Sequence, residues 1–420
     1  MWFGQPKGLR NFGIALGFLM AGASASAAPG DHLRAGDAVI TPSLGVGFEY
    51  RTNAFRSDSQ AQGTGALRIA PGLAVTAESP QVLFAFDGKY ALRKYLFLAN
   101  PNNVGQAEIS RQISNLDRFN AFNVSADLQA LRDRQISLRL NDTAVLRNNP
   151  NDSVPDSDDP YATQFRNSLT GGIVGRPGPA LSFDLGGTWR YSTFFVPSGV
   201  EQRDPLNSRN SFGPTLNIKY AFLPRTAYVV EARFTVNQWA TPTATLGDQS
   251  FPTPNSQHLQ ALTGVQGRIS ERLRLVLKGG YGTAWYADGN NLSAVNGLLL
   301  AMQADYDATK QHQITLGYRK SFIDSFFTNV AAHNSLYARW SGQYGERLSS
   351  NLTYGLRFEN YDGEVVQRND IVNQLRFALN YKANDWVTPS LSGGWLGRSS
   401  SDAIVEYNDV RVLLGATFQY

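Results

Sequence analysis

Arginine and lysine side chains recur at alternate positions in many short segments of this sequence, where they share one face with other polar residues. Guanidinium groups bind carboxylates and phosphates through forked pairs of hydrogen bonds, so an arginine-rich surface favours anionic or hydroxyl-rich solutes. The predicted members of this basic face are Arg68, Lys89, Arg139, Arg190, Lys219, Arg233, Arg268, Arg274, Lys278, Arg319, Arg339, Arg357, Arg376 and Arg411.

Acidic residues on the same face are fewer, and they leave a second interpretation open. In that interpretation the charges pair across neighbouring segments and only keep the face hydrated. Arg357 and Glu359 are one candidate pair. The acidic residues placed on this face are Glu49, Asp87, Asp127, Asp184, Glu231, Asp305, Asp307, Glu359 and Asp409.

A basic face of this kind requires extended segments, because successive side chains point to opposite faces only in a β-strand. In the segment 181–193, for example, Leu185 and Trp189 share one face while Asp184 and Arg190 share the other. About eighteen segments alternate in this way, and an even number is typical of bacterial single-chain barrels. They lie near 42–51, 65–77, 82–93, 119–131, 136–147, 163–175, 181–193, 211–222, 226–239, 258–269, 273–286, 297–308, 312–321, 334–344, 348–360, 371–382, 386–397 and 405–420.

The connections between these segments are short and long in turn, as in outer-membrane barrels with periplasmic turns and extracellular loops. Tight turns are expected at 78–80, 132–134, 176–179, 223–225, 270–272, 309–311, 345–347 and 383–385. A sheet in lipid must close on itself, because lipid offers no hydrogen bonds to its edge groups. The sequence therefore predicts an all-β protein, a transmembrane antiparallel barrel with short periplasmic turns and long extracellular loops.

The two ends of the chain agree with export to an outer membrane. Residues 1–27 have the basic start, short apolar run and small residues of a cleaved signal peptide. A short periplasmic segment is expected at 28–41, followed by the barrel at 42–420. The last strand alternates apolar and polar residues, as does the terminal signal by which such barrels are inserted. The predicted insertion signal comprises Leu414, Ala416, Phe418 and Tyr420.

Composition excludes several other classes of protein. After the leader no continuous apolar run approaches 18 residues, which argues against a helical membrane protein. A formal charge of +4 is too small to indicate nucleic-acid binding. A soluble all-β sandwich or propeller is the alternative to a membrane barrel. Those folds have shorter strands, however, and the sequence contains no blade repeat.

Catalysis and metal binding have weak support in the sequence. Of the four histidines, His258 and His333 start segments on the loop side, yet no hydrolase motif surrounds them. The aspartate-rich stretch 151–159 lacks the spacing of a calcium loop and fits a solvated loop better. The chain has no cysteine, which excludes disulfides and thiolate metal sites. We therefore expect no catalytic residue, cofactor or metal.

About eighteen strands leave an aqueous opening unless loops or a plug enter it, and the segment before the first strand is too short for a plug. A channel for polar or anionic solutes is therefore the expected function. Apolar pieces at 193–197 and 326–327 could form a constriction or lie at the outer interface. A non-conducting surface or adhesive barrel is the alternative from another class.

Several short motifs stand out in the mature chain: Gly45–Arg56, Ile69–Leu73, Tyr361–Gly363, Arg368–Asp370, Leu379–Tyr381, Ser399–Ser401, Glu406–Asn408 and the closing strand. They resemble those of a family of outer-membrane β-barrel porins. The resemblance covers most of the mature chain, and it implies a barrel of this kind. Some members belong to polysaccharide-secretion systems, so it also implies polysaccharide export, with a general diffusion or sugar-uptake porin as the alternative.

The sequence also leads to expectations about the location of the protein and its partners. The protein is expected in the outer membrane of a Gram-negative bacterium, in contact with lipid and lipopolysaccharide and inserted by the barrel-assembly machinery. The resemblance adds a periplasmic polysaccharide-export protein as a partner. No nucleic acid is expected to bind.

Overall fold

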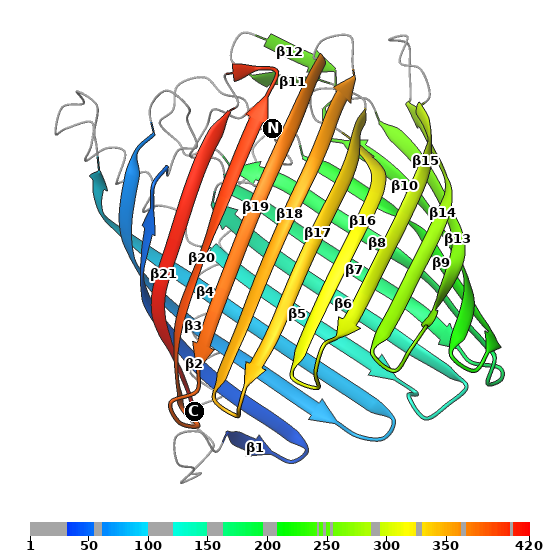
Figure 1. Cartoon of the computed structure of the whole chain (residues 1–420), viewed down its shortest axis with the longest axis horizontal. Coiled ribbons are helices and arrows are strands. Elements are labelled where there is room, and N and C mark those ends of the chain that lie inside the picture. Colours follow the sequence, from blue (N-terminus) through cyan, green and yellow to red (C-terminus); the bar gives the residue numbers. More distant parts are fainter. Residues whose placement is uncertain are drawn as a thin grey trace, which may run out of the picture.

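The computed structural model describes residues 32–53, 61–99, 121–148, 163–195, 208–241, 243–246, 249–252, 255–286, 295–324, 330–362, 367–403 and 406–420. Eighteen long antiparallel strands form one closed barrel, in which the strands run obliquely to the barrel axis (Figure 1). The described residues include no helix that is both long and apolar enough to cross a bilayer.

The barrel strands follow one another around the wall in chain order, each paired with its neighbour. Three shorter strands are also present: β1 (Leu33–Ala35) belongs to the same sheet, whereas β11 (Thr243–Leu246) and β12 (Gln249–Pro252) form a separate hairpin. The barrel strands are β2 (Ala38–Arg51), β3 (Gly63–Glu78), β4 (Val82–Ala99), β5 (Ala121–Ala130), β6 (Ile136–Asn148), β7 (Thr163–Gly175), β8 (Leu181–Phe195), β9 (Arg209–Leu223), β10 (Thr226–Trp239), β13 (Ser256–Arg268), β14 (Leu273–Tyr286), β15 (Val295–Asp307), β16 (His312–Asp324), β17 (Val330–Tyr344), β18 (Leu348–Asp362), β19 (Gln367–Tyr381), β20 (Val387–Ser400) and β21 (Tyr407–Gln419).

The strands and tight turns confirm the expected fold class. The main differences lie at strand ends: β2 begins at Ala38 instead of 42, and β4 continues to Ala99 instead of ending near 93. The register of β3 with β4 shifts between Gly65 and Ala66, and this irregularity interrupts the simple alternation on which the expected boundary of β4 depended.

Pairing of β2 with β21 closes the barrel. Ser43 to Arg51 pair with Gln419 to Arg411, and the amide of Tyr420 donates to the carbonyl of Pro42. Beyond the end of β21 the edge of β2 would be open, and there β1 pairs with Ala38–Ile40. The closing strands therefore leave little of their polar backbone unpaired, as a wall in lipid requires.

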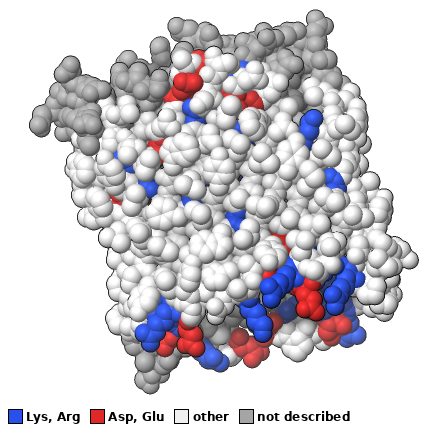
Figure 2. Space-filling model, in the orientation of Figure 1, with Lys and Arg blue, Asp and Glu red and all other residues white. Residues whose placement is uncertain are grey.

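The outer face of the wall is apolar, and the charges gather at its turn end. Leu67 and Ile69 of β3, for instance, are 49% and 48% exposed, whereas Arg68 between them points to the other side. Figure 2 shows a broad, mostly uncharged outer surface above a lower edge where lysines, arginines and acids lie together. Outer-membrane barrels present such an apolar band to lipid.

Aromatic side chains accompany the turn end of several strands. His312 stacks on Trp340 with ring centroids 6.0 Å apart, and Tyr344 packs edge-on against both rings. Trp386 lies 6.2 Å from Phe418 near the end of β21. Rings with a polar edge suit the headgroup region, so these contacts mark the membrane boundary next to the short turns.

Candidate functional site

The predicted basic residues all lie on the face of the sheet opposite the exposed apolar side chains, which is the inner face of the barrel. Alternation places them there: Leu138 and Leu140 are exposed on either side of Arg139, and Leu277 is exposed beside Lys278. The structure therefore places the predicted basic residues together on the inner wall, which they share with acidic residues. Whether these side chains line a conducting path stays a prediction.

Cross-strand pairing arranges many of them in rows. The first basic row runs from β14 to β2, and each residue in it lies directly opposite the next. Its basic members alternate mainly with small residues, so the guanidinium groups are spaced by about two strands. The order is Arg274, Asp305, Thr315, Arg339, Thr353, Arg376, Gly394, Arg411 and Arg51.

A second basic row lies beside the first and uses the intervening strands. It begins at Lys278, four positions beyond Arg274 on β14, which corresponds to roughly 13 Å along the strand. The two rows thus place basic residues on β14 and on every strand from β16 to β21. The order is Lys278, Ala301, Arg319, Ser335, Arg357, Val372, Arg398 and Tyr407.

The first basic row runs from the turn end of the barrel to its loop end. Arg274 is the second residue of β14 after a tight turn, whereas Arg51 is the last residue of β2 at the opposite end. A row of directly opposed residues runs perpendicular to the strands, and tilted strands convert it into a path along the axis. The oblique strands in Figure 1 show this tilt. Basic side chains therefore extend from the turn end to the loop end.

Pairing with acids neutralises only part of the basic set. Lys89, Arg139, Lys278, Arg357 and Arg411 form ion pairs with Asp87, Asp184, Glu231, Glu359 and Glu49. The pair of Arg357 with Glu359, 3.2 Å apart, confirms the expected one. In the part of the chain that the structure describes, the remaining members form no ion pair: Arg68, Arg190, Lys219, Arg233, Arg268, Arg274, Arg319, Arg339 and Arg376.

One wall of the barrel carries a recess of about 430 Å³ between these paired and unpaired groups. Arg139 contacts Asp184 at 2.7 Å, and Lys278 contacts Glu231 at 2.8 Å. Asn217 also donates to Glu231, at 3.0 Å. Because Arg233 and Arg319 line the same recess and form no ion pair with a described acid, its charge stays positive.

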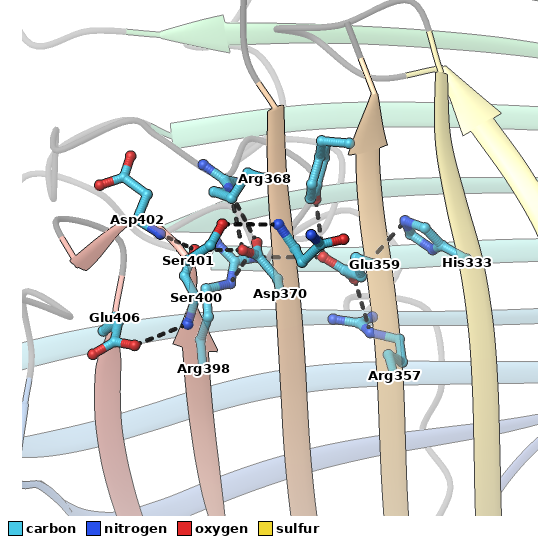
Figure 3. A network of polar contacts seen from close by, with 12 residues as sticks. His333, Arg357, Glu359, Arg368, Asp370, Arg398, Ser400, Ser401, Asp402 and Glu406 are labelled. Atoms are coloured by element: carbon cyan, nitrogen blue, oxygen red, sulfur yellow. Dashed lines mark hydrogen bonds and ion pairs between the residues drawn. The ribbon is translucent and has the colours of Figure 1, made fainter.

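A buried ionic network joins β17 to β20 toward the loop end (Figure 3). Arg398 contacts both Glu359 and Asp370 at 3.7 Å, and Arg368 contacts Asp370 at 3.0 Å. Ser400 donates to Asp370 at 2.6 Å. The side chains of Arg398 and Asp370 are 1% and 0% exposed, so water screens these contacts little. The network fixes the strands at the point where the long loops begin.

Several inner basic residues escaped the sequence prediction. Arg51 and Arg93 are the last positions of two predicted segments, and Arg368 and Arg398 fall just outside two others. Following the alternation to the last residue of the first two segments, and extending the other two by one to three residues, would have found them. Their positions near the loop end explain the omission, because the apolar alternation that marks a strand fades where the strand leaves the membrane.

The other predicted features are distributed differently. His258 packs near Tyr286 and Phe322, whereas His333 lies 3.9 Å from Glu359. Within the described ranges no three His, Asp or Glu residues are placed to hold a metal ion. The leader, the aspartate-rich stretch 151–159 and the pieces 196–197 and 326–327 lie outside the described residues.

The predicted insertion signal lies on the outer side of β21. Leu414 is opposite Phe48, Ala416 is opposite Val46, and Phe418 follows the same pattern. Tyr420 ends the chain beside Pro42 at the turn end. Recognition of these side chains by the assembly machinery stays a prediction.

Comparison with known proteins decides the family. Residues 28–420 match the family described as "Putative beta-barrel porin 2". The chain belongs to this family. It is accordingly an outer-membrane β-barrel porin of a Gram-negative bacterium. No curated protein matches the sequence.

Several solved outer-membrane proteins are similar to this chain in overall fold. One is Pseudomonas aeruginosa OpdK with vanillate, at 13% identity over 91% of this chain and 99% of that chain, with a TM-score of 0.44. Another is Acinetobacter baumannii OccAB3, at 11% identity over 92% and 100%, with a TM-score of 0.45. The FrpB iron transporter from Neisseria meningitidis matches at 8% identity over 91% and 81%, with a TM-score of 0.48.

Proposed function

We propose that this porin conducts anionic solutes and, most specifically, that it exports an acidic polysaccharide across the outer membrane. The observation that carries the proposal is the first basic row, which extends from Arg274 at the turn end to Arg51 at the loop end. Arg274, Arg339 and Arg376 in this row form no ion pair with a described acid. A mobile anion can therefore satisfy their charges.

The repetition of the row favours a polymer over a small solute. A small anion needs one binding position, whereas a chain with regularly spaced carboxylates can engage several guanidinium groups at once and move from one to the next. Conduction requires sites that attract a solute and release it easily, and multiple weak sites meet both needs. The spacers between the arginines include Thr315, Thr353 and Gly394, which leave the row open to a bulky chain.

Planar-bilayer recording tests the channel part of the proposal. In a potassium chloride gradient we expect a reversal potential that favours chloride, because the unpaired arginines attract anions. Added oligogalacturonate should interrupt the current, and a neutral glucose oligomer of the same length should not. Absence of conductance would support a non-conducting surface barrel, and cation selectivity would contradict the proposal.

The direction of transport needs an experiment in the cell. Deletion of the gene should remove an acidic polymer from the cell surface and leave it inside the envelope, while growth on small sugars stays normal. Retained surface polymer with slower uptake of a sugar would instead favour the general diffusion or sugar-uptake porin. Cross-linking of the charged turn end to a periplasmic protein would identify the expected export partner.

A further inference from the structure

The strands that close the barrel form a second recess of about 630 Å³, the seam recess, which is lined by several arginines. Arg51, Arg68 and Arg93 reach it from β2, β3 and β4, and Arg376 and Arg411 reach it from β19 and β21. Strands from the two ends of the chain therefore contribute to one site, which exists only in the closed barrel.

Two carboxylates hold part of this cluster in place. Glu49 lies 2.7 Å from Arg411 and 3.5 Å from Arg93, and Asp409 pairs with Arg51. Five guanidinium groups face two carboxylates in the lining, so the recess keeps an excess of positive charge. Because Glu49 is only 5% exposed, it orders the arginines without offering a free oxygen to water.

Arg68 and Arg376 are the two arginines of the seam recess that remain available to bind a solute. Arg68 lies directly opposite Arg93, and its buried Nε has no hydrogen-bond partner among the described residues. Neither Arg68 nor Arg376 forms an ion pair with a described acid. Gly394 is the cross-strand neighbour of both Arg376 and Arg411, so only a glycine separates these two positions. Buried donors without partners are costly, and an oxyanion would satisfy them.

We propose that this seam recess binds the oxyanion group of a sugar, with the carboxylate of a uronic acid as its preferred form. Arg68 and Arg376 make the direct contacts, and Glu49 and Asp409 position the neighbouring arginines. Planar guanidinium groups match a carboxylate in forked geometry, whereas a neutral sugar leaves them unsatisfied. The site deepens the proposed function and rests on it, because it would hold one charged unit of the solute on the inner wall.

Calorimetric titration of the purified porin in detergent, with glucuronate as the probe and glucose as its neutral counterpart, tests the site. We expect saturable binding of glucuronate, no binding of glucose, and at least a tenfold weaker affinity in the Arg68→Gln/Arg376→Gln variant. Heat-modifiable electrophoretic migration should show that the variant is folded. Arg268→Gln is the matched control, because Arg268 is also an inner arginine without an ion pair but lies at the turn end.

Three results would overturn the seam site: no glucuronate binding to the unaltered porin, unchanged affinity in the double variant, or an equal loss in Arg268→Gln. The reversal potential separates this inference from the proposed function. A selective channel that does not bind glucuronate would leave the proposed function intact and remove the site. Saturable binding that depends on Arg68 and Arg376, in a barrel that does not conduct, would keep the site and remove the channel.

Discussion

Arg411 on the last strand donates a hydrogen bond of 2.7 Å to Glu49 on the first long strand, so an ion pair joins the two ends of the barrel sheet. The two residues are 362 positions apart in the chain. Arg93 on β4 approaches the same carboxylate to 3.5 Å. Glu49 therefore compensates two arginines whose mutual repulsion would otherwise oppose closure of the barrel.

Glu49→Gln should lower the free energy of unfolding by about 3 kcal/mol, because removing this buried carboxylate leaves the largely buried charge of Arg93 uncompensated. Urea unfolding in phospholipid vesicles measures the change. Asp385→Asn is the matched control: hydrogen bonding and charge from Lys382 lower the pKa of Asp385, but the pair lies in an exposed turn and should contribute little. Equal effects of the two substitutions would show that the ion pair of Glu49 with Arg411 does not stabilise closure of the barrel.

Charge reversal in the first basic row should change ion selectivity. In the Arg274→Glu/Arg339→Glu/Arg376→Glu variant we expect the reversal potential to move toward cations, because three groups without acidic partners change sign on the inner wall. The Arg274→Lys/Arg339→Lys/Arg376→Lys variant keeps the charge and should keep the selectivity. An unchanged reversal potential in the reversed variant would mean that these side chains lie away from the conducting path.

The sequence could predict the barrel because the alternation along each strand and the turn residues between strands are local signals. The Arg357–Glu359 pair was predictable for the same reason, since two residues on one strand and two positions apart always share a face. The basic rows were not predictable, because they depend on which residues lie opposite one another on neighbouring strands. Register depends on the whole sheet and is not encoded by one segment.

The seam recess could not be predicted from the sequence. Its members come from both ends of the chain, and they meet only when β2 pairs with β21. Arg51 and Arg93 also stand at the ends of the predicted segments, where the apolar alternation is weak. The hairpin of β11 and β12 was missed for a related reason, because a pair of four-residue strands has no buried face to mark it.

The outer face contains one polar pair whose replacement should stabilise the protein. Asn167 donates a hydrogen bond of 2.9 Å to Asp142, and alternation places both on the apolar side of the middle of the wall. Asp142→Leu/Asn167→Leu should raise the free energy of unfolding in vesicles by about 1 kcal/mol, because a carboxylate facing lipid is unfavourable. Lower stability of the variant would indicate that another protein chain covers this face.

The conductance of the barrel should also depend on a glycine in its inner wall. Tyr337 lies across Gly317 on the neighbouring strand and donates a hydrogen bond of 2.9 Å to Gln303 on the strand beyond. A Cβ added at Gly317 would approach the ring of Tyr337 to 2.1 Å, so any larger residue must push the ring away from the wall. The ring then loses its hydrogen bond and moves toward the lumen.

Gly317→Val should therefore lower single-channel conductance and reduce the free energy of unfolding by about 1–3 kcal/mol, as overpacking commonly does. Tyr337→Ala in the same background removes the displaced ring, so it should restore the conductance while the stability stays low. Gly355→Val is the control, because Gly355 is the cross-strand partner of Tyr337 on its other side and has nothing within 4 Å of an added Cβ. If Gly317→Val and Gly355→Val gave the same conductance, displacement of Tyr337 could not be what narrows the pore.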